Sequence, residues 1–92
     1  MILTIYANQT MHVECDIIKE QKNKGRRLFT LQLNLERKNE FDQFRDDPME
    51  RFRMELQSDG METITGTGRF VWIPGQVNHG ADSFQILFEV ET

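Results

Sequence analysis

The alternation that decides the fold lies at residues 29–36, which read FTLQLNLE. Apolar and polar side chains alternate there with a period of two, the pattern of a strand with one buried face. Residues 10–18 upstream alternate in the same way. Residues 19–26 between them lack large apolar side chains and include Asn23 and Gly25, which suit a turn that needs positive φ. We therefore predict an antiparallel hairpin.

Three more stretches have the composition of strands. Ile2–Tyr6 is short and rich in β-branched residues. In Glu62–Ile73 and in Phe84–Glu91, successive side chains fall on two distinct faces with a period of two, in the latter nearly to the end of the chain. Gly66 and Gly68 interrupt the second of these stretches, which indicates a bulge, a bend or the close approach of another backbone.

A helix is predicted between the hairpin strand that begins at Phe29 and the strand Glu62–Ile73. Asp47 can cap the first turn, and Pro48 at the first helical position has no N–H to lose. Phe52 and Leu56 are four residues apart and would bury on the same side of the helix.

The predicted order is therefore β-β-β-α-β-β, in one domain that covers residues 1–92. One helix can cover only one face of a five-stranded sheet. We therefore expect a small α+β domain with a largely antiparallel five-stranded sheet and one helix on one face, or a sheet that curls into a partly open barrel.

Composition excludes several classes of protein. The chain has 92 residues, a net charge of -4 and one cysteine, so it holds neither an internal disulfide framework nor a zinc site built on several thiolates. No apolar run approaches the roughly 20 residues that span a membrane. Residues 1–11 lack the basic and apolar regions of a signal peptide. We expect a cytoplasmic protein.

Evidence for catalysis in the sequence is weak. His12, Glu14 and Asp16 would share one face of a strand, and His79 or Asp82 could join them at a metal. A metal-dependent hydrolase is therefore our third hypothesis, against the simpler interpretation of a solvated strand face.

Two further catalytic patterns fail on geometry. Alternation places Cys15 on the apolar face, where a thiol is inert. The glycines at 66 and 68 lack the spacing of a phosphate-binding loop. We therefore predict no catalytic residue, no metal and no cofactor, and hence no enzyme.

Basic residues gather near the predicted hairpin turn and support a nucleic-acid-binding alternative. Cationic side chains on an exposed loop could contact phosphates, and a neighbouring strand could extend the patch. A lysine-rich turn is otherwise a solvated turn or a guard against edge aggregation. The candidate residues are Lys22, Lys24, Arg26, Arg27 and Arg69.

Our first hypothesis is a non-enzymatic protein–protein interaction domain. Seven Phe, five Met and one Trp are many for 92 residues, and apolar residues outside the main core faces are typical of an interface. We expect the partner to be another protein or a second copy, bound through a sheet face, a strand edge or a loop. Size and the lack of chemistry fit an accessory, assembly or inhibitor protein, including those carried by viruses and mobile elements. The predicted interface residues are Val71, Trp72, Ile73, Gln76, Val77, Asn78 and His79.

Overall fold

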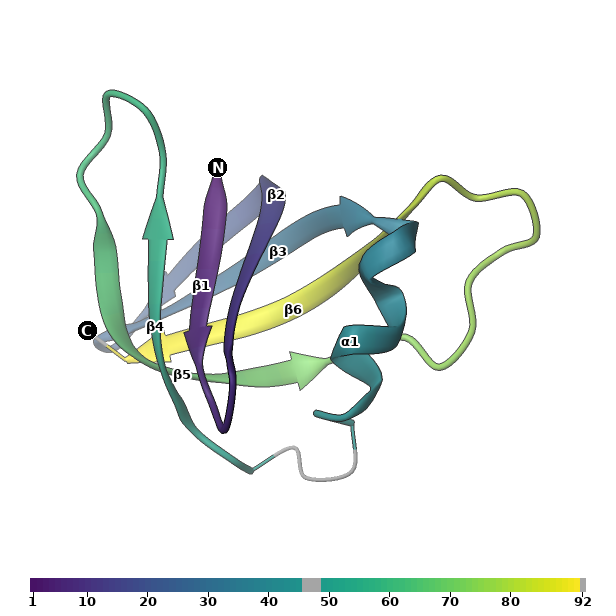
Figure 1. Cartoon of the computed structure of the whole chain (residues 1–92). Coiled ribbons are helices and arrows are strands. Elements are labelled where there is room, and N and C mark those ends of the chain that lie inside the picture. The colour runs from purple at the N-terminus through teal and green to yellow at the C-terminus, as the bar shows by residue number, and fades with distance from the viewer. Residues whose placement is uncertain (46–48, 92) are drawn as a thin grey trace.

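The computed structural model describes residues 1–45 and 49–91, and strands in these two ranges close into an antiparallel barrel (Figure 1). Six strands of the described chain follow one another around it in the order β1-β2-β3-β6-β5-β4, and β4 pairs with β1 to close the ring. The strands are β1 (Ile2–Tyr6), β2 (Thr10–Asn23), β3 (Arg26–Asn34), β4 (Phe52–Gln57), β5 (Ile64–Trp72) and β6 (Ser83–Glu91). A 3-10 turn, η1 (Leu35–Arg37), and a short helix, α1 (Lys38–Asp42), follow β3.

The antiparallel sheet is confirmed, but the predicted five strands, the partly open barrel and the predicted helix after Pro48 are wrong: the sheet of the described residues has six strands and is closed. Residues 52–57 form β4, which pairs with both β1 and β5. The spacing of Phe52 and Leu56 fits a helix, but Met54 between them is buried too, whereas Arg53 is exposed. Alternate burial is the pattern of a strand. The predicted cap at Asp47 lies outside the described residues.

The predicted hairpin of β2 and β3 is confirmed, although its strands are longer than expected. The turn contains two residues, Lys24 and Gly25, with φ of 48° and 79°. A two-residue turn with positive φ at both central positions has a backbone twist that matches the twist of the two flanking strands. Residues 19–23 pair with β3 although their side chains are exposed, so their strand conformation could not be predicted from a core pattern.

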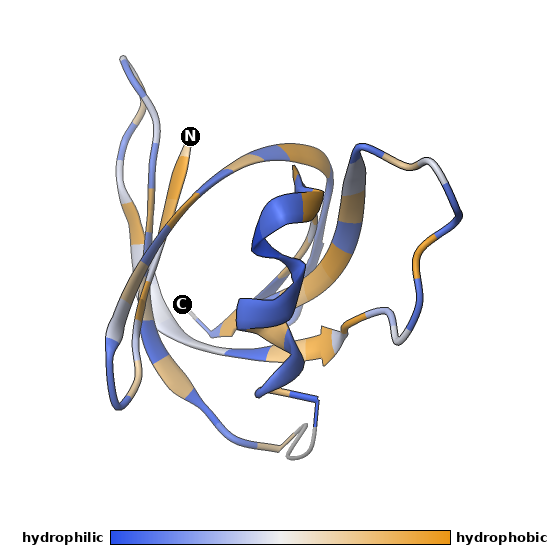
Figure 2. Ribbon diagram, turned by 45° about the vertical axis from the view of Figure 1, so that its right-hand side comes forward, coloured by the Kyte–Doolittle hydropathy of each residue, from blue (hydrophilic) through white to orange (hydrophobic). Residues whose placement is uncertain are grey.

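Apolar side chains from every strand fill the barrel interior, and they alternate with polar ones along the ribbon (Figure 2). Gly66 and Gly68 on β5 make room for this packing. A Cβ atom on Gly68 would lie 2.5 Å from the ring of Phe88, and one on Gly66 would lie 2.6 Å from the carbonyl oxygen of Glu91. The predicted close approach of another backbone is confirmed.

Phenylalanines close one end of the barrel beneath α1, which lies across that opening in Figure 2. Phe41 on α1 packs edge-on against Phe70 and Phe84, with ring centroids 5.7 and 5.8 Å apart. Phe44, just after α1, stacks on Phe70 at 4.7 Å and meets Phe52 at 5.0 Å. The short helix α1 therefore closes one end of the barrel, and no helix of the described residues covers a face of the sheet as the one predicted after Pro48 was expected to do.

A bulge near the end of β5 changes which side chains face outward. The pairing of β5 with β6 shifts between Phe70 and Trp72, so Val71 is the extra residue. Strict alternation would put Phe70 and Trp72 on the same face. Because the bulge reverses the alternation, Trp72 faces outward and Ile73 is buried.

Candidate interaction surfaces

The chain's one tryptophan lies on the outer wall of the barrel. Trp72 is 51% exposed, whereas all seven phenylalanines are buried. It pairs with Leu87 on β6, and Leu87 pairs with Thr30 on β3, so the three side chains form a row across three strands. We call Trp72, Leu87, Thr30 and the neighbouring Val71 the Trp72 surface.

A hollow of about 260 Å³ lies beside this surface. Val71 and Trp72 line it on the β5 side, and the buried rings of Phe44 and Phe70 lie behind it. Arg45 lines the hollow as well, so a partner would meet a guanidinium next to the exposed indole.

The predicted interface is only partly at the surface. Val71 and Trp72 are exposed, but Ile73 is 8% exposed and belongs to the core, so its prediction as a surface contact is wrong. The reason is the bulge described above. A charge placed at Ile73 would disrupt the fold and would not report on binding.

The rest of the predicted interface lies in the connection from β5 to β6, which projects from the barrel (Figure 1). Gln76, Asn78 and His79 are exposed, whereas Val77 is half-buried and packs against the core. The backbone N–H of Ala81 donates to the carbonyl oxygen of Asn78 at 3.0 Å, which forms a turn at the tip.

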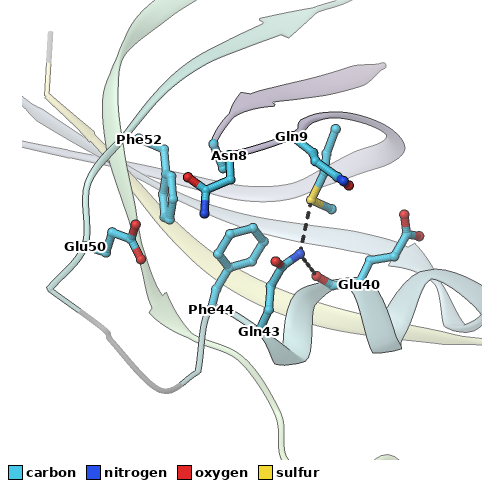
Figure 3. A pocket seen from close by; sticks show the side chains of 9 residues that line it. Asn8, Gln9, Glu40, Gln43, Phe44, Glu50 and Phe52 are labelled. Carbon is cyan, nitrogen blue, oxygen red and sulfur yellow. Dashed lines mark hydrogen bonds between the residues drawn. The ribbon is translucent and has the colours of Figure 1, made fainter.

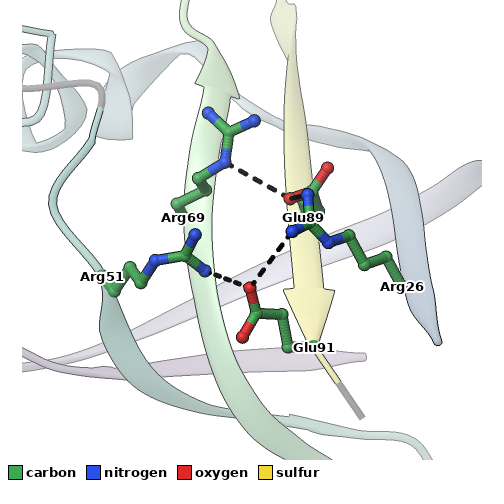
Figure 4. Close-up of polar contacts among 5 residues, drawn as sticks. All are labelled: Arg26, Arg51, Arg69, Glu89 and Glu91. Atoms are coloured by element: carbon green, nitrogen blue, oxygen red, sulfur yellow. Dashed lines mark hydrogen bonds and ion pairs between the residues drawn. The ribbon is translucent and has the colours of Figure 1, made fainter. Parts of the chain in front are cut away.

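Glutamates neutralise two of the arginines proposed to contact nucleic acid (Figure 4). Arg69 Nε lies 3.3 Å from a carboxylate oxygen of Glu89, and Arg26 Nη1 lies 3.5 Å from the same oxygen. Glu91 lies 3.8 Å from Arg26 and also pairs with Arg51. The sequence placed Glu89 and Glu91 near the end of the chain, but only the barrel register brings them to the basic residues.

Arg27 is paired as well. Its Nε donates to Glu20 at 2.6 Å, and its guanidinium lies 5.2 Å from the ring centroid of Phe29. Lys22 and Lys24 are exposed on the hairpin and make no ion pair within residues 1–45 and 49–91. Release of counterions from phosphates depends on free cations, so pairing of the arginines weakens the nucleic-acid hypothesis.

The histidine and the carboxylates of β2 lie on its solvated side. The Nδ1 atom of His12 is 3.0 Å from the hydroxyl oxygen of Thr4 on β1. His12, Glu14 and Asp16 are exposed, and the described chain nowhere gathers three His, Cys, Asp or Glu side chains in a metal-binding arrangement. The structure therefore gives the metal-dependent hydrolase no support.

Cys15 is buried on the inner face of β2, as predicted from alternation. Burial raises the pKa of its thiol to about 11, and the nearby carboxylate of Asp16 also raises it. A thiol with this pKa is almost fully protonated at neutral pH, which makes it a poor nucleophile.

Sequence reasoning missed a polar cleft of about 500 Å³ beside α1 (Figure 3). The edges of Phe44 and Phe52 form its base, and Asn8 and Gln43 contribute amides from two different segments. The Gln43 amide donates to the carbonyl oxygen of Glu40 at 2.7 Å. No motif marks this cleft, because its lining comes from the β1–β2 turn, the end of α1 and the start of β4.

Glu40 at the rim of the cleft is held in its ionised form. Its carboxylate accepts a hydrogen bond from Arg37 Nη2 at 3.0 Å and a second one from Nε. These bonds to Arg37 lower the pKa of Glu40 below its ordinary value. A carboxylate stabilised in this way is unsuited to donate a proton in general acid catalysis.

Comparisons with protein-family models, with curated proteins and with solved structures found no match to this chain. No helix within residues 1–45 and 49–91 has the length and apolar character needed to span a membrane.

Proposed function

We propose that this protein is a non-enzymatic interaction domain that binds another protein through the Trp72 surface. One observation carries the proposal. All seven phenylalanines of this chain are buried, yet its tryptophan is half exposed on the outer wall. Tryptophan is enriched among the residues that contribute most to binding energy at protein interfaces.

The exposed part of Trp72 is large enough to matter energetically. A tryptophan can bury about 200 Å². Covering the half that is exposed would remove about 100 Å² from water, worth about 2.5 kcal/mol at 25 cal/mol per Å². Leu87 beside it is half-buried and would add apolar area to the same contact.

The packing of the barrel supports an external site over an internal one. Side chains such as Phe29, Leu31 and Phe88 are fully buried inside it, so the interior is a packed core. Binding on the outer wall leaves that core intact. The proposal therefore includes no catalytic step and no cofactor.

A wider role for the protein also follows as a proposal. A small domain that acts by binding fits an accessory, assembly or inhibitor protein, including one encoded by a virus or a mobile element. The buried, reduced thiol of Cys15 suits the cytoplasm.

The test compares truncations of two exposed aromatics on different walls. Trp72 lies on β5, whereas Tyr6 is 40% exposed on β1 and packs against Arg53. Tagged wild type, Trp72→Ala and Tyr6→Ala proteins would be used to capture partners from lysate with and without nuclease treatment. The captured protein would then be identified, purified and titrated against each variant.

We expect Trp72→Ala to weaken the affinity by about 30-fold, the equivalent of about 2 kcal/mol, while Tyr6→Ala binds like the wild type. Equal affinity of all three proteins would refute the Trp72 surface. Capture that disappears with nuclease treatment would instead favour nucleic-acid binding by Lys22 and Lys24.

A further inference from the structure

Strand β2 has an unpaired edge over its second half. Its first residues, Thr10–Glu14, pair with β1, and the N–H of Cys15 donates to the carbonyl oxygen of Met1 at 2.9 Å. Beyond this point β2 pairs with β3 alone within the described residues. In Figure 1, β2 bends beyond the start of β1 and then runs beside β3 to the hairpin turn. Residues 18–26 are all exposed.

The register of the hairpin shows which backbone groups lie on this edge. The two-residue turn makes Asn23 and Arg26 its closing pair, which exchanges both backbone hydrogen bonds. Because bonded and non-bonded pairs alternate in an antiparallel ladder, the N–H and C=O groups of Gln21 also point toward β3. Those of Glu20 and Lys22 point away from β3, toward the open edge.

We propose that two copies of this protein join these edges as antiparallel strands, about a two-fold axis centred on Gln21. In that register each Gln21 faces the Gln21 of the second copy. Glu20 of each copy lies opposite Lys22 of the other, so the free N–H and C=O groups of these two residues bond to each other. The same register sets an acidic side chain opposite a basic one at two places, so that each Glu20 would lie between Arg27 of its own copy and Lys22 of the other.

Charge selects this register over the neighbouring symmetric ones. A two-fold axis at Lys19, Glu20 or Lys22 would set that residue opposite its own copy, with like charges in contact. An axis at Ile18 would bring Asp16 opposite Glu20, again with like charges. Among the symmetric registers centred on residues from Ile18 to Lys22, only the register centred on Gln21 sets no two residues of like charge opposite each other.

The edge available for this contact is short, and its two-fold symmetry limits the association to a dimer. The pairing of β2 with β3 shifts between Ile17 and Lys19, which ends the regular edge on that side. The hairpin turn ends it on the other side. A two-fold contact uses each edge once and therefore closes without forming a fibre.

This dimer goes beyond the proposed function and uses a different part of the barrel. Thr30 at one end of the Trp72 surface pairs with Lys19 of β2, but β3 and β6 lie between β2 and Trp72 itself, so the indole stays accessible in the dimer. The two proposals can therefore fail separately.

Disulfide cross-linking tests the register directly. Opposed residues of a non-bonded pair have Cα atoms about 4.5 Å apart, within the range that a disulfide spans. Gln21→Cys should therefore form a covalent dimer on mild oxidation. Lys19→Cys and Asn23→Cys are matched controls, because each residue would lie about 14 Å from its own copy along the ladder. Native Cys15 is buried and stays unreactive.

A mixture of the Lys19→Cys and Asn23→Cys proteins should cross-link as a heterodimer, because those two positions oppose each other in this register. Efficient dimers from Gln21→Cys and from the mixture, but not from either control alone, are the expected result. Cross-linking of Gln21→Cys at the rate of the two controls would overturn the register.

Sedimentation equilibrium tests the dimer without a new thiol. Lys22→Glu replaces two attractive pairs by two repulsive ones and should weaken the dimer about ten-fold or more. Lys24→Glu makes the same change of charge at the turn and should leave the dimer unaffected, as should Trp72→Ala. A wild type that stays monomeric at millimolar concentration would overturn the proposal, as would equal effects of the two lysine substitutions.

Discussion

Gly68→Ala tests the packing on which the barrel wall depends. The added Cβ would lie 2.5 Å from the ring of Phe88 and 2.8 Å from the backbone carbonyl oxygen of Glu89. Neither neighbour can yield easily. Phe88 is fully buried and packs edge-on against Phe70 at 5.0 Å, and the carbonyl belongs to the paired strand β6.

The size of the effect follows from two opposing terms. Overpacking a core costs about 1–3 kcal/mol, and contact with backbone places this site at the upper end. Replacing glycine by alanine returns about 0.4–1 kcal/mol by restricting the unfolded chain. We therefore expect a net loss of about 2 kcal/mol in the free energy of unfolding. For a domain of this length that corresponds to a melting temperature lower by about 10 °C.

Urea and thermal unfolding, followed by the fluorescence of Trp72, would measure the loss. Gly75→Ala is the matched control, because its Cβ would meet only the guanidinium end of Arg45, at 2.7 Å, which can move away. Neither Gly68 nor Gly75 has a positive φ, so alanine meets no left-handed backbone strain at either site. If Gly68→Ala proves as stable as Gly75→Ala, the close approach of β5 and β6 is refuted.

Three further predictions follow from burial and charge. Met54→Ala should lower the free energy of unfolding by about 2–5 kcal/mol in urea, because Met54 is fully buried on β4, whereas Met61→Ala at an exposed position should change it by less than about 0.5 kcal/mol. Cys15 should resist alkylation at pH 8 in the folded protein and react on unfolding; rapid labelling of the native thiol would contradict its burial and a pKa of about 11. Arg37→Gln should raise the pKa of Glu40 toward its ordinary value in an NMR titration, since Arg37 lowers that pKa in the folded wild type. The associated stabilisation is present at neutral pH and is lost as the pH falls through the folded pKa of Glu40.

Residue composition and period-two alternation predicted the bounds of two strands closely. Strand β1 has the predicted bounds, and β6 differs from the prediction by one residue at its start. Around β4 the sequence fits the period of a helix as well as the period of a strand, because the spacing of Phe52 and Leu56 is compatible with both. The burial of Met54 distinguishes the two structures, but it depends on pairing with β1 and β5, which are distant in sequence.

The candidate site was harder to predict for a related reason. The bulge at Val71 reverses the alternation, and no local signal in VWI marks it, so Ile73 was assigned to the surface. The pairing of Arg69 with Glu89 depends on the register of β5 against β6, which a single sequence leaves open. Sequence patterns thus predict local conformation well, whereas surface chemistry depends on contacts between strands.

The closed ring of strands has a consequence for how the chain folds. β1-β2-β3 and β4-β5-β6 are each built from hairpins between neighbouring strands, which can form rapidly and locally. Two seams join these halves. In one seam β1 pairs with β4, with Tyr6 opposite Arg53 at one end and Ile2 opposite Gln57 at the other. In the second seam β3 pairs with β6. Both seams connect residues about 50 or more positions apart in the sequence. Closing the ring therefore carries most of the loop-closure entropy, and we expect folding in milliseconds to seconds, with the seams formed after the hairpins.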